Sequence, residues 1–281
     1  MRWGVGNEVN WLEILLLGLI SGLSAFIPVS SSGHERLLLH LFGITQADPL
    51  CHLVLTFGTF LAVVTGCKEL LRRLMVERAI AHRTGRRRAF GSRHYDYRIV
   101  KTAMLPLALV YVVCSLIPIS LSLPGLALAF IINGIVLFVA ENMRHGNKES
   151  NRMTALDSIL MGILGGTSAI PGISLTGMVS SVAVARGAKL KNALDWSLMI
   201  MVPALLLQMA LDLLFVVFCG TTLSFAGFFW CLGGGLFAFV GGRFSIRVVK
   251  SVIERAHLSE SIYPYYVWGA AFLSFILFMI T

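Results

Sequence analysis

Two short segments of this chain place hydroxyl side chains beside residues that interrupt helices. The first reads PVSSSGHER at 28–36, and the second reads PGISLTG at 171–177. Pro and Gly break the regular helical hydrogen bonds and leave backbone N–H groups unpaired next to the hydroxyls. Helix N-termini of this kind bind anions such as phosphate. The expected anion-binding residues are the small and hydroxyl residues of both segments: Ser30, Ser32, Gly33, Gly172, Ser174 and Thr176.

His34 is the imidazole next to these segments. A histidine can act as a general base, or it can be a structural residue with satisfied ring nitrogens, and the sequence leaves both roles open. Further hydroxyls lie in the flanking apolar stretches, where Ser and Thr usually bond to a carbonyl of the preceding turn or help helices to pack closely. These residues are Ser21, Ser24, Thr167, Ser168, Ser180 and Ser181.

The elements that position these segments must lie in a membrane. Of the 281 residues, 57% are hydrophobic and 13% are charged, and the mean hydropathy is +0.81. A soluble domain needs more charge to cover its surface, and apolar runs of about 17–25 residues match helices that span a bilayer. Continuous runs in place of alternation favour helices over a β-barrel. The five cysteines have no metal-ligand or disulfide spacing and are interpreted as buried apolar residues.

The positive charges orient the chain. The segment 67–101 is rich in Lys and Arg and is predicted to be a cytoplasmic basic loop, because such residues accumulate on that side. This placement explains the net charge of +9 without a nucleic-acid partner. Working outwards from this loop, both termini are predicted to be external. The six predicted transmembrane spans are 49–66, 101–121, 124–141, 194–219, 223–242 and 262–281.

Each of the other apolar stretches is too short to cross the membrane alone. Residues 11–28 and 33–43 flank the first hydroxyl segment, and 155–170 and the stretch up to Arg186 flank the second. We therefore expect two re-entrant hairpins whose tips, near Ser30–Gly33 and Pro171–Ser174, meet near the membrane midplane. The hairpins also resemble each other: GLISGLSAFIPVSS at 18–31 aligns with GILGGTSAIPGIS at 162–174, which pairs Ser31 with Ser174.

The predicted fold is therefore an all-α integral membrane protein. It has six transmembrane helices plus two re-entrant helical hairpins in an inverted repeat, with halves at 1–150 and 151–281.

Four segments, in order, resemble the undecaprenyl-diphosphate phosphatase family of the bacitracin-resistance type. They are GLSAFIPVSSSGH at 22–34, LTFGTFLAVV at 55–64, PGISLTG at 171–177 and LDWSLMIMVPA at 194–204. The resemblance covers nearly the whole chain and implies the same fold. It also implies a multi-pass protein of the bacterial inner membrane that acts on a polyprenyl phosphate or diphosphate, the lipid carrier of peptidoglycan synthesis. Ser31 and His34 would then form a catalytic pair of nucleophile and base.

The chain departs from the family motifs at their charged positions. The two glutamates of E-G-x-x-E are Ser21 and Ala25 here, and the arginine and last threonine of P-G-x-S-R-S-G-x-T are Leu175 and Val179. The resemblance assigns the glutamates to cation binding or proton relay and the arginine to the diphosphate. No metal ligand is therefore assigned, and a divalent cation is expected only if the chain is active. Losing one electrostatic group costs roughly 3–4 kcal/mol of transition-state stabilisation, so we predict weak or absent hydrolysis.

Three functions stay open: a phosphatase, a transporter or flippase for a lipid phosphate, and a binding paralogue without turnover. Glu13 and Glu35 are the candidate replacements for the missing carboxylates. A monophosphate should suit a site without a cation better than a diphosphate. The sequence fixes neither the lipid chain length nor the oligomeric state, and it is compatible with a homodimer.

Overall fold

The computed structural model describes residues 10–44, 47–84, 95–116, 122–143, 146–221, 223–255 and 262–280. Regular structure in these ranges is helical, and one isolated bridge joins Lys148 to Ala188. The α-helices and two 3-10 helices (η) are α1 (Trp11–Ala25), α2 (Ser31–Leu41), α3 (Pro49–Gly66), α4 (Lys68–Thr84), α5 (Tyr95–Leu116), α6 (Leu123–Asn142), η1 (Ser150–Arg152), α7 (Ala155–Gly166), η2 (Thr167–Ala169), α8 (Leu175–Ala185), α9 (Leu190–Cys219), α10 (Phe225–Arg255) and α11 (Ile262–Ile280).

Among the described helices, six are long and apolar enough to cross a membrane: α3, α5, α6, α9, α10 and α11. They coincide with the six predicted spans, which are therefore confirmed.

Three of these spans have different limits, since α5 begins at Tyr95, α9 begins at Leu190 and α10 continues to Arg255. The extension of α10 carries Arg243 and Lys250, which lie seven residues apart and so share a helix face. The Lys250 ammonium donates a hydrogen bond to the carbonyl of Gly66 at 2.8 Å, which holds this extension against α3.

The predicted basic loop at 67–101 is largely helical, because α4 and the start of α5 cover it except for residues 85–94, which lie outside the described residues. Its Lys, Arg, Glu, Leu and Ala residues are strong helix formers, which explains the difference. Asp96, which is buried, anchors this end of the molecule. Its carboxylate accepts hydrogen bonds from Ser150 Oγ (2.6 Å) and Trp196 Nε1 (2.9 Å) and pairs with Arg73 (2.9 Å).

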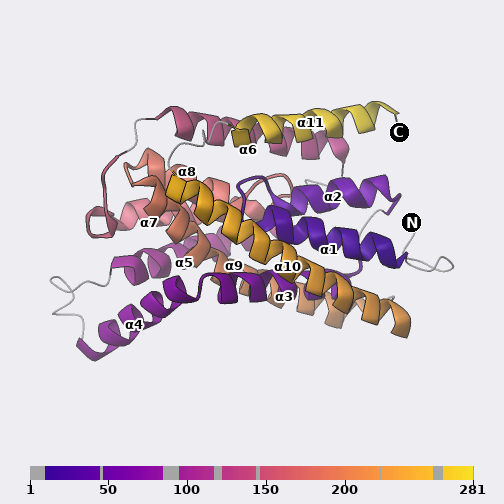
Figure 1. Cartoon of the computed structure of the whole chain (residues 1–281), viewed down its shortest axis with the longest axis horizontal. Helices are drawn as coiled ribbons and strands as arrows, with labels where there is room; N and C mark the ends of the chain where they lie inside the picture. The colour runs from indigo at the N-terminus through magenta and orange to yellow at the C-terminus, as the bar shows by residue number, and fades with distance from the viewer. Residues whose placement is uncertain are drawn as a thin grey trace.

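Two pairs of short helices, α1/α2 and α7/α8, form hairpins that open toward opposite ends of the molecule (Figure 1). At 1.5 Å per residue, the 15 residues of α1 extend only about 22 Å, which is less than the roughly 30 Å of a bilayer core. The start of α1 and the end of α11 lie at one end of the molecule, and α4 lies at the other (Figure 1). This arrangement agrees with the predicted re-entrant hairpins. Which end faces the cytoplasm stays a prediction.

The two hairpins pack against their neighbours in the same way, as an internal repeat requires. A Cβ atom added to Gly18 of α1 would lie 2.1 Å from the carbonyl oxygen of Gly234 in α10. The aligned Gly162 of α7 has the same relation to Ala103 of α5, with a separation of 2.3 Å. Both glycines therefore allow a helix–helix approach that no side chain would permit.

The two halves of the chain are interlocked and do not lie beside each other as separate units. The first arm of each hairpin packs on a span of the other half, α1 on α10 and α7 on α5. Two further pairs, α6 with α11 and α3 with α9, also join the halves. This exchange of partners is what a two-fold relation between inverted halves produces.

Candidate functional site

The tips of the two hairpins share one local structure. Ser30 is the N-cap of α2 and its Oγ accepts a hydrogen bond from Gly33 N at 3.2 Å, whereas Ser174 is the N-cap of α8 and its Oγ accepts from Gly177 N at 3.2 Å. In each tip a second hydroxyl lies two residues further on: Ser32 Oγ is 3.3 Å from Ser30 Oγ, and Thr176 Oγ1 is 3.0 Å from Ser174 Oγ. Ser30 is therefore the structural counterpart of Ser174, and our alignment of Ser31 with Ser174 was wrong by one residue. The aligned prolines misled it, because the second tip has one more residue between its proline and its cap.

The tips touch each other directly. Gly172 N donates a hydrogen bond to Ser30 Oγ at 3.1 Å, and Thr176 Oγ1 donates one to the carbonyl of Ile27 at 3.3 Å. Gly33 lies at the point of closest approach, since a Cβ atom there would be 2.8 Å from Gly172 N. The predicted meeting of the two tips is therefore confirmed.

Asn133 of α6 joins the tips from the side and is fully buried. Its Nδ2 donates to the carbonyl of Pro28 at 3.3 Å, and its Oδ1 accepts from Ser174 N at 3.1 Å. Together with the bonds of Ser30, these contacts already satisfy several of the tip N–H groups that we expected to hold an anion. The hydroxyls of Ser30 and Ser174 are also hydrogen-bonded within or between the tips, whereas no bond of the Ser31 hydroxyl is found among the described residues.

Ser30 has an unusual backbone conformation for a residue with a side chain, with φ of 71°. Such conformations cost of the order of 1–3 kcal/mol and persist where surrounding contacts fix them. Here the fixing contacts are those of the Ser30 hydroxyl with both tips, which hold the turn between the two hairpin arms.

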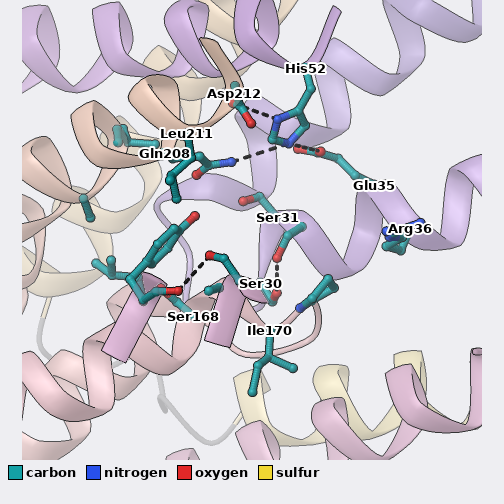
Figure 2. A pocket seen from close by; sticks show the side chains of 18 of the residues that line it. Ser30, Ser31, Glu35, Arg36, His52, Ser168, Ile170, Gln208, Leu211 and Asp212 are labelled. Carbon is teal, nitrogen blue, oxygen red and sulfur yellow. Dashed lines mark hydrogen bonds and ion pairs between the residues drawn. The ribbon is translucent and has the colours of Figure 1, made fainter. Parts of the chain in front are cut away.

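A cavity of about 670 Å³ lies beside the tips (Figure 2). Four predicted site residues line it: Ser30, Ser31, Ser32 and Ser174. From the tips the cavity extends past α3, α5 and α9 to residues near the ends of these helices, including Asp48 and Gly220. Its wall also includes apolar side chains such as Leu39, Leu205 and Phe215. It therefore offers hydroxyls at one end and apolar contact along its length, as the phosphate and prenyl parts of a lipid would require.

The other predicted site residues are not among those that line this cavity. Gly33, Gly172 and Thr176 lie in the contact between the tips and position the serines. Of the further hydroxyls, Ser168 lines the cavity, whereas Ser24 and Ser180 donate to carbonyls four residues earlier in their own helices.

His34 points toward α11. Its Nδ1 lies 2.7 Å from the carbonyl oxygen of Ser30, and its Nε2 lies 2.9 Å from the hydroxyl of Tyr266. Its ring stacks on that of Tyr266 at 5.6 Å and meets the edge of Phe130. No bond from His34 to Ser31 is found among the described contacts, so their catalytic pairing stays a prediction.

A second polar group lines the same cavity (Figure 2), and of its residues the sequence analysis named only Glu35. His52 of α3 lies at its centre. The Nδ1 of His52 is 2.9 Å from Asp212 Oδ2, and its Nε2 is 3.6 Å from Glu35 Oε2 and 3.4 Å from Gln208 Nε2. Arg36 lies beside Glu35 in the wall. The sequence did contain a signal, since an ionisable residue inside an apolar span, such as His52 or Asp212, is a functional candidate by default.

The acidic residues of the wall do not form a metal site. No group of three or more His, Cys, Asp or Glu side chains in the described part of the chain could hold a metal ion. Asp48 caps α3 and accepts from Thr221 Oγ1 at 3.0 Å. Asp212 and Glu35 lie on different nitrogens of one imidazole and do not converge on a common point. Of the proposed replacements for the missing carboxylates, Glu35 lines the cavity, whereas Glu13 is not among its lining residues.

The fold and this cavity define a class: helical multi-pass membrane proteins with two opposed hairpins whose serine-rich tips meet at a polar cavity. The family model for the bacitracin resistance protein BacA matches residues 14–273, so the chain belongs to that family. An undecaprenyl-diphosphatase of Carboxydothermus hydrogenoformans is 28% identical over 262 residues, covering 92% of this chain and 94% of that protein. Undecaprenyl-diphosphatase 3 of Bacillus cereus is 28% identical over 282 residues, covering 94% and 96%. An undecaprenyl-diphosphatase of Treponema denticola is 25% identical over 249 residues, covering 88% and 90%.

With its six candidate spans, the chain is a multi-pass membrane protein of this bacterial family, and the relatives above are named as undecaprenyl-diphosphatases. The resemblance stated from the motifs alone is thereby confirmed. The inner membrane, the external termini and the homodimer stay predictions.

Proposed function

We propose that this chain binds the phosphate end of a polyprenyl diphosphate in the cavity and releases the terminal phosphate slowly. The observation that carries the proposal is the convergence of both hairpin tips on one cavity wall, with Ser30, Ser31, Ser32 and Ser174 exposed to it. Each hydroxyl contributes about 0.5–1.5 kcal/mol net as a hydrogen-bond partner, so several must act together. The apolar wall supports contact with the prenyl chain, and the names of the relatives support the choice of lipid.

The substitutions in the motifs support slow turnover. Leu175 lines the cavity at the position of the family's arginine, and Ala25 lines it at the position of its second glutamate. Neither side chain can neutralise charge that develops on a phosphate in the transition state. The loss of one such group typically lowers kcat by about 10²–10³. We therefore expect turnover at least about 10²-fold below that of a relative with complete motifs.

The interlocked halves favour an enzyme over a carrier that rocks one half against the other. Such rocking would have to separate α1 from α10, where Gly18 and Gly22 would place added Cβ atoms only 2.1 and 2.2 Å from carbonyl oxygens of α10. Interfaces packed this closely have few alternative arrangements. A fixed cavity with hydrolysis in place is consistent with this packing.

Binding and turnover need separate tests. The binding test is the thermal stabilisation of the purified protein by undecaprenyl phosphate, undecaprenyl diphosphate and undecaprenol at equal concentration. Both phosphorylated lipids should stabilise more than the alcohol, and the monophosphate should stabilise most, because Glu35, Asp48 and Asp212 in the wall oppose added negative charge. A ligand at 100 times its Kd adds about 2.7 kcal/mol. Equal stabilisation by the alcohol would show that the tips recognise no phosphate.

The turnover test is phosphate release from undecaprenyl diphosphate, with the Carboxydothermus protein as the positive control. Release that is detectable but at least about 10²-fold slower supports the proposal. Turnover equal to that of the control would contradict the argument from the missing charges. Binding without any release would leave a binding paralogue.

A further inference from the structure

Two histidines are candidate bases for Ser31, and they are not equivalent. His34 is three residues from Ser31 in the chain, but its two ring nitrogens lie at hydrogen-bond distance from the Ser30 carbonyl and the Tyr266 hydroxyl. His34 does not appear among the residues that line the cavity, whereas His52 and Ser31 both do.

His52 has the geometry of an oriented base. A carboxylate can only accept a hydrogen bond, so Asp212 Oδ2 at 2.9 Å fixes the proton of a neutral His52 on Nδ1. The other nitrogen, Nε2, then carries the lone pair that can take a proton, and it lies 3.4 Å from the Gln208 amide nitrogen in the cavity wall. A carboxylate that orients an imidazole in this way is the arrangement of hydrolytic triads, where it also stabilises the imidazolium that forms.

Ser31 lies on the same side of α2 as Glu35, a residue that lies near this base. Ser31 and Glu35 are four residues apart on α2, so they occupy the same helix face with Cβ atoms about 5–6 Å apart. Both line the cavity, and Glu35 Oε2 lies 3.6 Å from His52 Nε2. Figure 2 shows Ser31 between the tip residue Ser30 and the group formed by His52, Glu35 and Gln208.

We propose that His52, oriented by Asp212, is the base that serves Ser31 in this chain, and that His34 is a structural residue. The proposal rests on the proposed function. It replaces our earlier pairing of Ser31 with His34.

The reaction follows in two balanced steps. Ser31 Oγ attacks the terminal phosphorus while its proton passes to His52 Nε2. The bond from phosphorus to the bridging oxygen breaks, and its electron pair leaves with the lipid monophosphate, which takes the proton from His52 and so returns the imidazole to its neutral form. Water then attacks the phosphoserine and gives a proton to His52 Nε2. The serine oxygen departs with the electron pair of the P–O bond and recovers that proton.

Glu35 has a defined part in these steps. Its carboxylate lies near Nε2, where the imidazolium carries its second proton, and so stabilises the charged ring electrostatically. Glu35 thus occupies the cavity although both motif glutamates are absent. The charged groups that act on His52 are Asp212 of α9 and Glu35 and Arg36 of α2, and the ionisable residues Tyr111 of α5 and Asp48 line the same cavity.

The experiment compares His52→Ala and His34→Ala. The matched control is His82→Ala, because His82 lies on α4 and is exposed. Phosphate release from undecaprenyl diphosphate is measured across pH, with and without free imidazole, and lipid-dependent thermal stabilisation is measured for each variant. General base catalysis contributes about 10²–10⁴-fold. We expect His52→Ala to lose at least about 10²-fold in kcat with lipid binding retained, and to lose the acidic limb of the pH profile.

Rescue separates a chemical role from a structural one. Free imidazole should restore release by His52→Ala, because the cavity of about 670 Å³ can admit it. His34→Ala should have a lower Tm, an unchanged pH profile and no response to imidazole. Asp212→Asn should lower kcat with little change in KM, as expected of a positioning residue.

Three results would overturn the proposal. The first is phosphate release by a folded His52→Ala protein at the rate of the native protein. This result would leave the proposed function intact. The second is rescue of His34→Ala in place of His52→Ala. The third is binding of the lipid by the native protein without release, which also removes hydrolysis from the proposed function but leaves phosphate recognition in place.

Discussion

Asn133 offers the most direct test of the idea that one side chain holds the two hairpin tips together. It is fully buried on α6, and its amide connects the Pro28 carbonyl to Ser174 N. Asn133→Leu keeps the volume of the side chain but removes both hydrogen bonds. Asn142→Leu is the matched control, because this second asparagine of α6 is exposed and its amide donates to the carbonyl of Phe138 in its own helix.

The expected magnitude follows from the two contacts. Hydrogen bonds between membrane helices average about 0.6 kcal/mol each, so the two bonds contribute about 1.2 kcal/mol. The variant also leaves a buried amide and a buried carbonyl without this partner, at a cost of about 1–3 kcal/mol each. The costs of the two unpaired groups already include the loss of their bonds, so the free energy of unfolding should fall by about 2–6 kcal/mol, which corresponds to a Tm about 4–24 °C lower.

The assay is thermal unfolding of purified Asn133→Leu and Asn142→Leu, each with and without undecaprenyl phosphate. Asn133→Leu should also lose most of the lipid-dependent stabilisation, because Ser174 loses the contact that fixes its position in the cavity wall. Asn142→Leu should change Tm by less than about 1 °C. The reasoning is refuted if the two variants unfold at the same temperature, since the tips would then be held together without Asn133.

Two further predictions concern the stability of the end of the molecule that carries α4 and the orientation of the chain in the membrane. Asp96→Ala should lower the free energy of unfolding by about 2–4 kcal/mol, because it removes an ion pair and leaves the buried Trp196 N–H without its acceptor, whereas Ser150→Ala should cost only about 0.5–1.5 kcal/mol. Equal Tm values for the two variants would contradict this ranking. Cysteines placed at Met75 of α4 and Ser122 before α6, both exposed, should react with an impermeant maleimide from opposite sides of the membrane, with Met75→Cys labelled from the cytoplasm. Labelling of both from one side would refute the predicted topology.

The large features of the fold could be predicted because they depend on local properties. Apolar length located the six spans, and Pro28 and Pro171 located the breaks between the hairpin arms. The limits of the helices were less accurate, since basic residues at the end of α10 continue the helix beyond its apolar part. The serine caps were misaligned because the two tips differ in length by one residue.

The candidate site was predicted only in part, for a physical reason. The sequence shows that His34 is near the first tip, but it does not show which side of α2 faces the cavity. The contact between His52 and Asp212 joins residues 160 positions apart. No local pattern encodes such a contact, which forms only when α3 and α9 pack together.

The close contact of α1 with α10 has a consequence for the synthesis of the protein. α1 ends at Ala25 and α10 begins at Phe225, so about 200 residues must be added before the partner of α1 exists. At about 5–20 residues per second this takes at least about 10 s. During that time α1, too short to span the bilayer, lacks the surface that receives Gly18 and Gly22. The first hairpin can therefore reach its final position only after most of the chain has entered the membrane, and a chain truncated before α10 should be a substrate for quality-control proteases.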